Sequence, residues 1–328
     1  MSIQQDAGVM LAGPFVSVDG VAFLPAPRSR QLGFYAVARR AFPQGRKLML
    51  KRLRYVVRAW RDRHIHTEWL RFLDAHFSAL DARMPQLYAK IQSTYVLRAL
   101  DTAARVRLLQ DHYGGFFSAS RLLSEAVHSR SGLALWSFEH TDAAVQLRLC
   151  HLPICWREGE ISLALFDDAR LICALTFVVT SLRECGAGDG GKSLVIGGIQ
   201  GLHDAEGLNI FRTLTKSMYG LRPFSLLINA IRAVAQAFGA QRVLAIGDTQ
   251  HALTHKRASN KVRISYDEIW SDHGGTPVTG GMFDLGNMTP LKSSAEIPSN
   301  KRAQYRRRYQ LMDELACAIE SAIAAANR

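Results

Sequence analysis

The hydrophobic pattern is most regular over residues 192–248. This stretch opens with a short apolar run that ends in glycines, which is typical of a buried strand breaking into a loop. Apolar residues then recur at helical spacing over 208–218 and again over 224–238, before a second apolar run at 243–246. Strand, glycine loop, helices and strand predict a right-handed crossover between parallel strands. Such units place ligand sites at the carboxyl ends of their strands.

Upstream of this stretch, the pattern divides the chain near residue 110. The apolar spacing is helical over 32–110, with one helix predicted at 96–109, whereas from about residue 133 apolar residues alternate or run together as strands do. The predicted strands are 133–136, 145–149, 161–165 and 171–182, with a hairpin turn at 167–170. An antiparallel meander therefore leads into the crossover.

Beyond residue 248 the chain is polar and its predicted elements are short. We expect strands at 263–266 and 281–285, separated by a glycine turn at 274–275. Residues 301–325 have helical spacing, with a cluster of arginines first and one apolar face after it.

These elements predict an α+β fold with a mixed, mainly antiparallel sheet and a βαβ crossover, preceded by a basic helical region. We expect an N-terminal arm over 1–27, the basic helical region over 28–110, and an α/β domain with a C-terminal helix over 111–328.

Charge changes this picture, because the chain of 328 residues has a formal net charge of +13. The first 110 residues carry 18 Lys and Arg against 7 Asp and Glu. Such a field favours polyanions, namely nucleic acid, anionic lipid headgroups or a phosphorylated small molecule. In residues 50–63, positive side chains alternate with apolar and aromatic ones, as in helices that lie on membranes or phosphate backbones. A basic surface that serves only solubility is the alternative.

The remaining composition indicates a cytoplasmic protein. The longest apolar run, 171–179, is far shorter than the roughly 20 residues that span a bilayer. The N-terminus has no charged region followed by an apolar core, so we expect no signal peptide. Five scattered cysteines are typical of a reducing compartment. Peripheral contact with the inner membrane stays open through the basic region.

Two motifs resemble sites but do not meet the requirements of those sites. Residues 186–193 match the phosphate-loop pattern GxxxxGK[ST], but the apolar run that follows predicts a strand where a helix is needed to hold phosphates. Cys150, His151 and Cys155 supply three ligand-like side chains, whereas a structural zinc site needs four. We therefore predict a glycine-rich hairpin loop and no metal.

Polar residues that follow the strands of the crossover are the candidate site. Histidine and aspartate there are suited to general-base catalysis, and lysine and arginine to binding an anionic donor. We assign catalysis to Asp248, His251 and His203. We assign donor binding to Gln200, Gly201, Lys216, Arg222 and Tyr266. A set of polar loops without catalytic role is the alternative.

Several motifs resemble the VirK/YbjX family of bacterial proteins. They are Ile199-Gln200-Gly201, Thr215-Lys216 through Tyr219-Gly220-Leu221-Arg222-Pro223, Tyr266-Asp267 with Trp270, and residues 301–309. The resemblance runs from about residue 32 to 323. It implies an association with envelope remodelling, resistance to cationic peptides and display of a virulence surface protein, but it brings no assigned reaction or catalytic residue.

The order of the predicted elements is similar to the acyl-CoA N-acyltransferase (GNAT-like) arrangement. That resemblance implies a donor pyrophosphate held by backbone N–H groups after the central strand. The chain departs from it by lacking the usual Gln/Arg-x-x-Gly-x-Gly/Ala loop and by having two helices where one is expected. A charged tRNA is therefore an alternative donor to acyl-CoA.

Two hypotheses follow from the sequence. The first is a transferase that moves an acyl or aminoacyl group from an anionic donor, acyl-CoA or aminoacyl-tRNA, to an amine or hydroxyl acceptor linked to the envelope. The second is a non-enzymatic regulator or adaptor that binds nucleic acid or the inner membrane face through its basic helical region.

Overall fold

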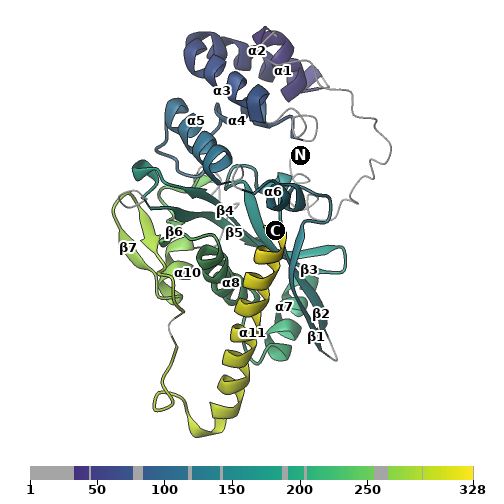
Figure 1. Cartoon of the computed structure of the whole chain (residues 1–328), viewed down its shortest axis with the longest axis vertical. Helices are drawn as coiled ribbons and strands as arrows, with labels where there is room; N and C mark the ends of the chain where they lie inside the picture. Colours follow the sequence, from purple (N-terminus) through teal and green to yellow (C-terminus); the bar gives the residue numbers. More distant parts are fainter. Residues whose placement is uncertain are drawn as a thin grey trace. The chain divides into compact units, whose positions relative to one another are not determined.

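The structure, a computed structural model, describes residues 33–43, 46–76, 84–116, 120–140, 143–186, 191–202, 205–254, 265–289 and 291–327. The chain divides into two compact units (Figure 1). Unit 1 consists of the residues up to Tyr95 together with Ala99–Gln110, and unit 2 of Val96–Arg98 together with 111–328. The predicted arm over 1–27 lies outside the described residues.

Unit 1 is helical. Its helices are α1 (Phe34–Ala41), α2 (Arg46–Arg61), α3 (Arg63–His76), α4 (Leu87–Lys90) and α5 (Thr102–Gln110). Their shared core contains Tyr55, Trp69 and Tyr88, all almost fully buried. The indole N–H of Trp69 donates to the Leu87 carbonyl at 3.0 Å, so the ring buries its apolar surface without leaving a polar atom unsatisfied.

The helix predicted over 96–109 begins only at Thr102, so its first part was wrong. Val96–Arg98 belongs to unit 2, where the Val96 N–H donates to the Arg157 carbonyl and the Arg98 N–H to the Gln250 carbonyl, both at 2.8 Å. Tertiary backbone hydrogen bonds here override a helical pattern of side chains.

Unit 2 contains an eight-stranded sheet in the order β1-β2-β3-β4-β5-β6-β8-β7. The strands are β1 (Leu133–His140), β2 (Ala143–Cys150), β3 (Ile161–Asp167), β4 (Arg170–Thr180), β5 (Ser193–Gly201), β6 (Arg242–Ile246), β7 (Thr276–Val278) and β8 (Met282–Asp284). Every neighbouring pair is antiparallel except β5 and β6, which are parallel. The predicted α+β class and its mainly antiparallel sheet are confirmed.

The crossover from β5 to β6 passes through α7 (Ala205–Ser217) and α8 (Pro223–Ala237), as predicted. Pro223 begins α8 after an extended Arg222, as proline does in a first helical turn. Most of α8 is buried, and α11 (Arg302–Ala326) packs along it (Figure 1). The buried residues of α11 include Leu311, Leu315 and Ile319, which share one face of the helix. The remaining helices of unit 2 include α6 (Arg121–Val127), α10 (Tyr266–Asp272) and the π-helix η2 (Asp111–Phe116).

The predicted strand over 263–266 was wrong at Ser265 and Tyr266, the two residues of this segment that the structure describes. Tyr266 is the first residue of α10, and the Ser265 hydroxyl caps this helix by accepting from the Glu268 N–H at 3.2 Å. Residues 263–264 lie outside the described residues. In the described part of the chain, no helix has the length and apolar character needed to cross a membrane.

The parallel strands separate before they end. β5 pairs with β6 only over Ser193–Ile196 and 242–245. β5 then continues along β4 to Gly201, with a bulge between the two pairs Thr176–Gly198 and Phe177–Ile196. Residues 247–254 meanwhile leave the sheet through turns. A separation of this kind exposes backbone and side chains of both strands to whatever lies between them.

Candidate active site

Two ionisable side chains meet where the parallel strands separate. The Oε1 of Glu158 lies 3.3 Å from the Nε2 of His251, and their side chains are only 2% and 1% exposed. The Leu253 N–H donates to the Nδ1 of His251 at 3.2 Å, which assigns the ring proton to Nε2, on the side of the carboxylate. Glu158 and His251 therefore form an acid–base pair inside unit 2.

Glycines in β5 make room for Glu158. A Cβ on Gly197 would lie 1.8 Å from the Glu158 carbonyl oxygen, and a Cβ on Gly198 would lie 2.7 Å from the carboxyl carbon. Side-chain atoms do not approach other atoms so closely, so only glycine allows the 158 backbone and carboxylate to pack against the strand.

Gln200, the next polar residue of β5, binds the other oxygen of the carboxylate. Its Nε2 donates to Glu158 Oε2 at 2.5 Å. Gln200 is partly exposed, unlike Glu158 and His251, so it is the member through which the pair reaches the surface of unit 2. A charge-assisted hydrogen bond of this kind stabilises the carboxylate and fixes its orientation.

Tyr266 covers the imidazole. Its ring stacks on His251 with centroids 4.5 Å apart and planes at 22°, and its hydroxyl donates to the Ile199 carbonyl at 3.3 Å. Trp270 stacks behind Tyr266 and donates to the Ile246 carbonyl at 2.9 Å. α10 thus places two aromatic rings between β5 and β6, where they exclude water from the pair.

Asp248 holds α10 in place. Its carboxylate accepts from the Tyr266 N–H at 2.8 Å and from the Ser265 hydroxyl at 3.2 Å, while the Asp248 N–H donates to Asp267 at 2.8 Å. A carboxylate at a helix start satisfies an N–H that has no partner within the helix. Asp248 therefore positions Tyr266.

The structure brings together only part of the predicted site. His251, Gln200 and Tyr266 lie within the cluster around Glu158, whereas Lys216 and Arg222 are exposed side chains on the last turn of α7 and just before α8. Gly201 packs against the rings of Phe211 and Phe224, where a Cβ would lie 3.0–3.1 Å away. His203 lies outside the described residues.

Sequence reasoning missed Glu158. No periodic pattern marks it, because it stands in a turn between the 3-10 helix η4 (Pro153–Cys155) and β3. Its partners Gln200 and His251 come 42 and 93 positions later. The available signal was Gly197-Gly198 inside an apolar strand, since paired glycines there indicate close approach by another part of the chain.

A second buried glutamate lies two residues further on. Glu160 is 1% exposed and accepts a short hydrogen bond from the hydroxyl of Tyr113 on η2. Burial and the neighbouring Glu160 raise the pKa of Tyr113 well above its usual range, so the phenol stays a proton donor to the carboxylate. Glu160 is thus held by the interior of unit 2 through Tyr113.

No metal site appears among the residues that the structure describes, where no three His, Cys, Asp or Glu side chains converge. Burial raises the pKa of Cys150 to about 12, so this thiol stays protonated and is a poor metal ligand. Ser193, the last residue of the phosphate-loop pattern, opens β5, so a strand follows this pattern.

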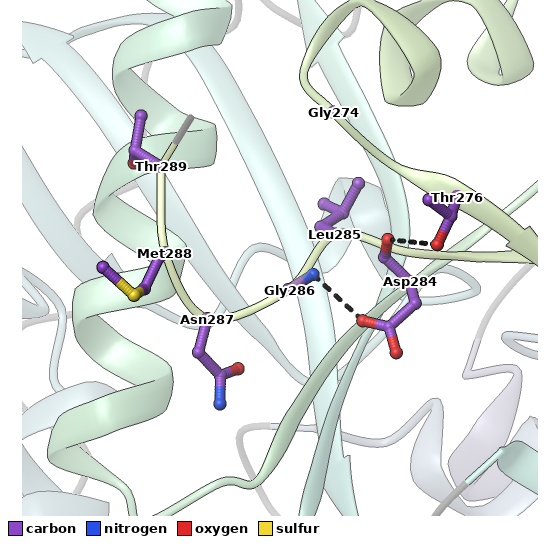
Figure 2. Close-up of a pocket in the computed structure, with 8 residues that line it drawn as sticks. All are labelled: Gly274, Thr276, Asp284, Leu285, Gly286, Asn287, Met288 and Thr289. Carbon is purple, nitrogen blue, oxygen red and sulfur yellow. Dashed lines mark hydrogen bonds between the residues drawn. The ribbon is translucent and has the colours of Figure 1, made fainter. Parts of the chain in front are cut away.

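A surface pocket lies elsewhere, beside β8 (Figure 2). It is lined by Gly274, Thr276, Asp284, Leu285, Gly286, Asn287, Met288 and Thr289. The Oδ1 of Asp284 accepts from the Gly286 N–H at 2.9 Å, and its Oδ2 accepts from the Arg242 guanidinium at 2.8 Å. Both oxygens of the Asp284 carboxylate are therefore used to hold the end of β8, and we assign no ligand to this pocket.

The resemblance motifs at 215–223 and 301–309 meet at one joint. Arg308 of α11 donates two hydrogen bonds to the Tyr219 carbonyl, at 3.1 and 2.9 Å. Gly220 has a φ of +82°, and a Cβ there would lie 2.4 Å from the Arg308 guanidinium. Glycine is thus required both by the backbone and by the arginine, and this motif fixes α11 to the α7–α8 turn.

The fold and the site define the class of protein: an α+β protein with a buried carboxylate–imidazole pair between two separating parallel strands. Residues 44–321 match a family model described as "Protein of unknown function (DUF535)", so the chain belongs to the DUF535 family. The predicted VirK/YbjX resemblance is confirmed, since the chain is 25% identical to "Uncharacterized protein YbjX" of Escherichia coli K12 over 280 residues, 80% of this chain and 81% of that one.

Two further relatives are proteins of Haemophilus influenzae Rd, each described as "Uncharacterized protein". They are 28% and 29% identical over 129 and 133 residues, which span 39% and 40% of this chain and 44% of each relative. Among solved structures, two mutants of a cAMP-binding acyltransferase from Mycobacterium smegmatis are 13% identical, with TM-scores of 0.32 and 0.31. The alignments cover 70% of this chain and 67% and 66% of those chains.

Proposed function

We propose that this protein is a transferase that moves an acyl or aminoacyl group from an anionic donor to an amine or hydroxyl acceptor. In this proposal Glu158 and His251 form the acid–base pair. The observation that carries it is their 3.3 Å approach inside unit 2, at the ends of two parallel strands that separate. Strand ends of this kind are where α/β crossovers bind ligands.

The cost of burying these groups supports a catalytic role. Taking a carboxylate out of water costs several kcal/mol unless its partners compensate fully. Among the described residues, Glu158 receives one amide hydrogen bond, from Gln200, and faces an imidazole, without the two-pronged arginine contact that structural carboxylates often have. Buried titratable groups set beside one another concentrate at catalytic sites.

The pair is suited to proton transfer in acyl exchange. The acceptor's nitrogen or oxygen bonds to the acyl carbon while the donor's C–S or C–O bond breaks. The proton that the acceptor loses passes to the Glu158–His251 pair, and from it to the departing thiolate or alkoxide. Tyr266, stacked on His251, holds the ring and keeps water out.

The donor would lie along α7 and α8. Gln200 and Gly201 end β5 before α7, and Lys216 and Arg222 supply exposed positive charge nearby in sequence. Phosphates are bound by such side chains together with N–H groups at helix starts. Both acyl-CoA and aminoacyl-tRNA carry the required phosphates, and we place the reaction in the cytoplasm, with an acceptor destined for the envelope.

A transfer assay with labelled donors tests this proposal. The purified chain is incubated with labelled acyl-CoAs of several lengths and with labelled aminoacyl-tRNAs, and cell-envelope extracts supply the acceptors. We expect label on an acceptor, and a loss of at least about 100-fold in rate for Glu158→Gln. Glu160→Gln is the matched control, because it changes an equally buried glutamate outside the pair. No transfer from either donor, or equal rates for Glu158→Gln and wild type, overturns it.

A second candidate function is binding without catalysis through the basic helical region. The exposed side chains of α2 favour it, because they combine positive charge with large apolar groups. It predicts that Glu158→Gln leaves function in cells intact, whereas charge-reversing changes in α2 abolish it.

A further inference from the structure

Helix α2 of unit 1 leaves large apolar side chains in solvent. Five of them are at least 59% exposed: Met49, Leu50, Leu53, Val57 and Trp60. Single exposed apolar residues are ordinary on proteins, but a contiguous group marks a surface that meets a partner or a membrane. Elsewhere in the described chain, the exposed large apolar residues are spread over several segments: Tyr35, Leu122, Leu208, Met288 and Leu291.

These five side chains form one stripe. Positions 49, 53, 57 and 60 follow one another at intervals of three or four residues, which places them on the same side of an α-helix. The core-facing side is separate, because Tyr55 and Ala59 are the buried residues among 48–61, the part of α2 whose side chains are described. α2 therefore has two apolar faces, and only one of them packs against the described residues of unit 1.

Positive charge borders the exposed stripe. Lys51, Arg54, Arg58 and Arg61 are exposed, and α2 contains no acidic residue. Arg52 donates to the Phe42 carbonyl at 2.8 and 2.6 Å. At the exposed surface, Arg58 donates to the Gln92 carbonyl at 3.3 Å, and Arg61 pairs with Asp62, the residue after α2, at 2.9 Å. The helix thus presents an apolar stripe with basic side chains beside it, and a tryptophan within the stripe.

We propose that this stripe docks unit 1 on an anionic lipid surface, with α2 lying in the plane of the interface. The apolar side chains would enter the boundary between headgroups and acyl chains, while the basic side chains contact anionic headgroups. A nucleic acid would use the basic side chains and Trp60 but offers no apolar phase for Met49, Leu53 and Val57. Charge and apolar area together therefore favour lipid.

This inference goes beyond the proposed transfer reaction and is tested without it. The full chain is mixed with vesicles of phosphatidylcholine alone or with 30% phosphatidylglycerol, and bound protein is measured by sedimentation. We expect at least about tenfold tighter binding to the anionic vesicles, weakening as salt rises. We also expect a blue shift of tryptophan fluorescence that Trp60→Phe removes.

Two paired variants separate the stripe from general hydrophobicity. Leu53→Gln combined with Val57→Gln should weaken vesicle binding at least about tenfold, whereas Leu208→Gln, an equally exposed leucine of unit 2, should not. Sedimentation velocity and binding to a short RNA duplex are measured on the same proteins. The proposal is overturned if no vesicles bind, if the paired variant binds like wild type, or if the stripe instead mediates self-association or RNA binding.

Discussion

Unit 1 exposes a stripe of apolar side chains on α2, whereas unit 2 encloses a carboxylate–imidazole pair that is almost fully buried. The stripe of α2 puts Leu53 and Trp60 in solvent, while the sheet unit encloses Glu158 and His251. Both arrangements cost free energy relative to the usual distribution of residues. The difference matches the two roles proposed above, namely contact with an apolar phase in one unit and chemistry away from water in the other.

The two units accommodate these side chains in different ways. In unit 2, Gly197 and Gly198 remove the atoms that would collide with Glu158, and Tyr266 packs on His251. In unit 1, the buried face of α2 supplies the packing, so the exposed face is left open.

Gly197→Ala should destabilise unit 2 the most. Its new Cβ would lie 1.8 Å from the Glu158 carbonyl oxygen. This oxygen is a backbone atom, so it cannot rotate out of the way as the end of a side chain can. We expect a loss of at least about 3 kcal/mol in the free energy of unfolding, measured by urea denaturation. Gly115→Ala is the control, because the nearest atom to its Cβ would be 3.6 Å away. Equal stability of the two variants would contradict the proposed packing of residue 158.

Acid should loosen unit 1 through His66, which is fully buried between Phe34 and Tyr55. Burial lowers the pKa of His66 to about 4. Above pH 6.5 the ring is neutral in both states, so it has no effect. As the pH falls from 6.5 to 4 the unfolded chain binds the extra proton, and about 3 kcal/mol of stability is lost. Hydrogen exchange of α3 amides measures it.

The matched variant for this prediction is His66→Phe, which keeps an aromatic ring between Phe34 and Tyr55 but cannot titrate. Its α3 amides should show a much weaker dependence on pH over the same range. If wild type and His66→Phe respond alike, another group is responsible and the interior of unit 1 does not hold a neutral histidine.

Arg232 can be compared with Glu158, because it is also a buried charged residue of unit 2 but has a structural role. Its Nη2 donates to the carbonyls of His273 and Leu285, both at 2.9 Å, and burial lowers its pKa to about 10. Arg232→Met leaves these carbonyls unpaired and should cost about 2–3 kcal/mol of stability. The proposed transfer rate per folded molecule should not change. Glu158→Gln should lower the transfer rate and leave stability nearly unchanged. If both variants lose transfer rate per folded molecule, the structural role of Arg232 is not distinct from the catalytic role proposed for Glu158.

Leu53→Gln should have the smallest effect on stability. Leu53 is 59% exposed, so the substitution should change the free energy of unfolding by less than about 0.5 kcal/mol. Leu73→Gln, at a buried position of α3, should cost several times more. A large loss from Leu53→Gln in thermal unfolding would mean that the stripe is covered in the folded chain.

Much of the fold could be predicted from the sequence, because its elements have strong local signals. Pro223 and the apolar stripe of α8 mark a buried helix, and the apolar runs on either side mark β5 and β6. Tyr266 was placed in a strand because a short alternating segment preceded it. In the structure Tyr266 begins a helix, because Ser265 and Asp248 accept hydrogen bonds from N–H groups of its first turn. Asp248 belongs to a turn that lies 18 residues earlier in the chain.

The candidate site was harder to predict, because its members come together only through the fold. His251, Gln200 and Tyr266 could be chosen because each lies after a strand or in a recognised motif. Glu158 reaches them only because the strands of the meander pair in a register that packs the turn at residue 158 against Gly197 of β5. Register is a property of pairing between strands, so no local pattern reveals it.

The most direct test of the central claim is a single-turnover transfer rate, measured with the donor that labels best, for wild type, Glu158→Gln and Glu160→Gln. Thermal unfolding and donor affinity are recorded alongside for each protein. The account predicts a rate at least about 100-fold lower for Glu158→Gln, with its melting temperature and donor affinity retained, and a near-normal rate for folded Glu160→Gln. Equal rates for the three proteins, or an equal loss in both variants, would contradict it.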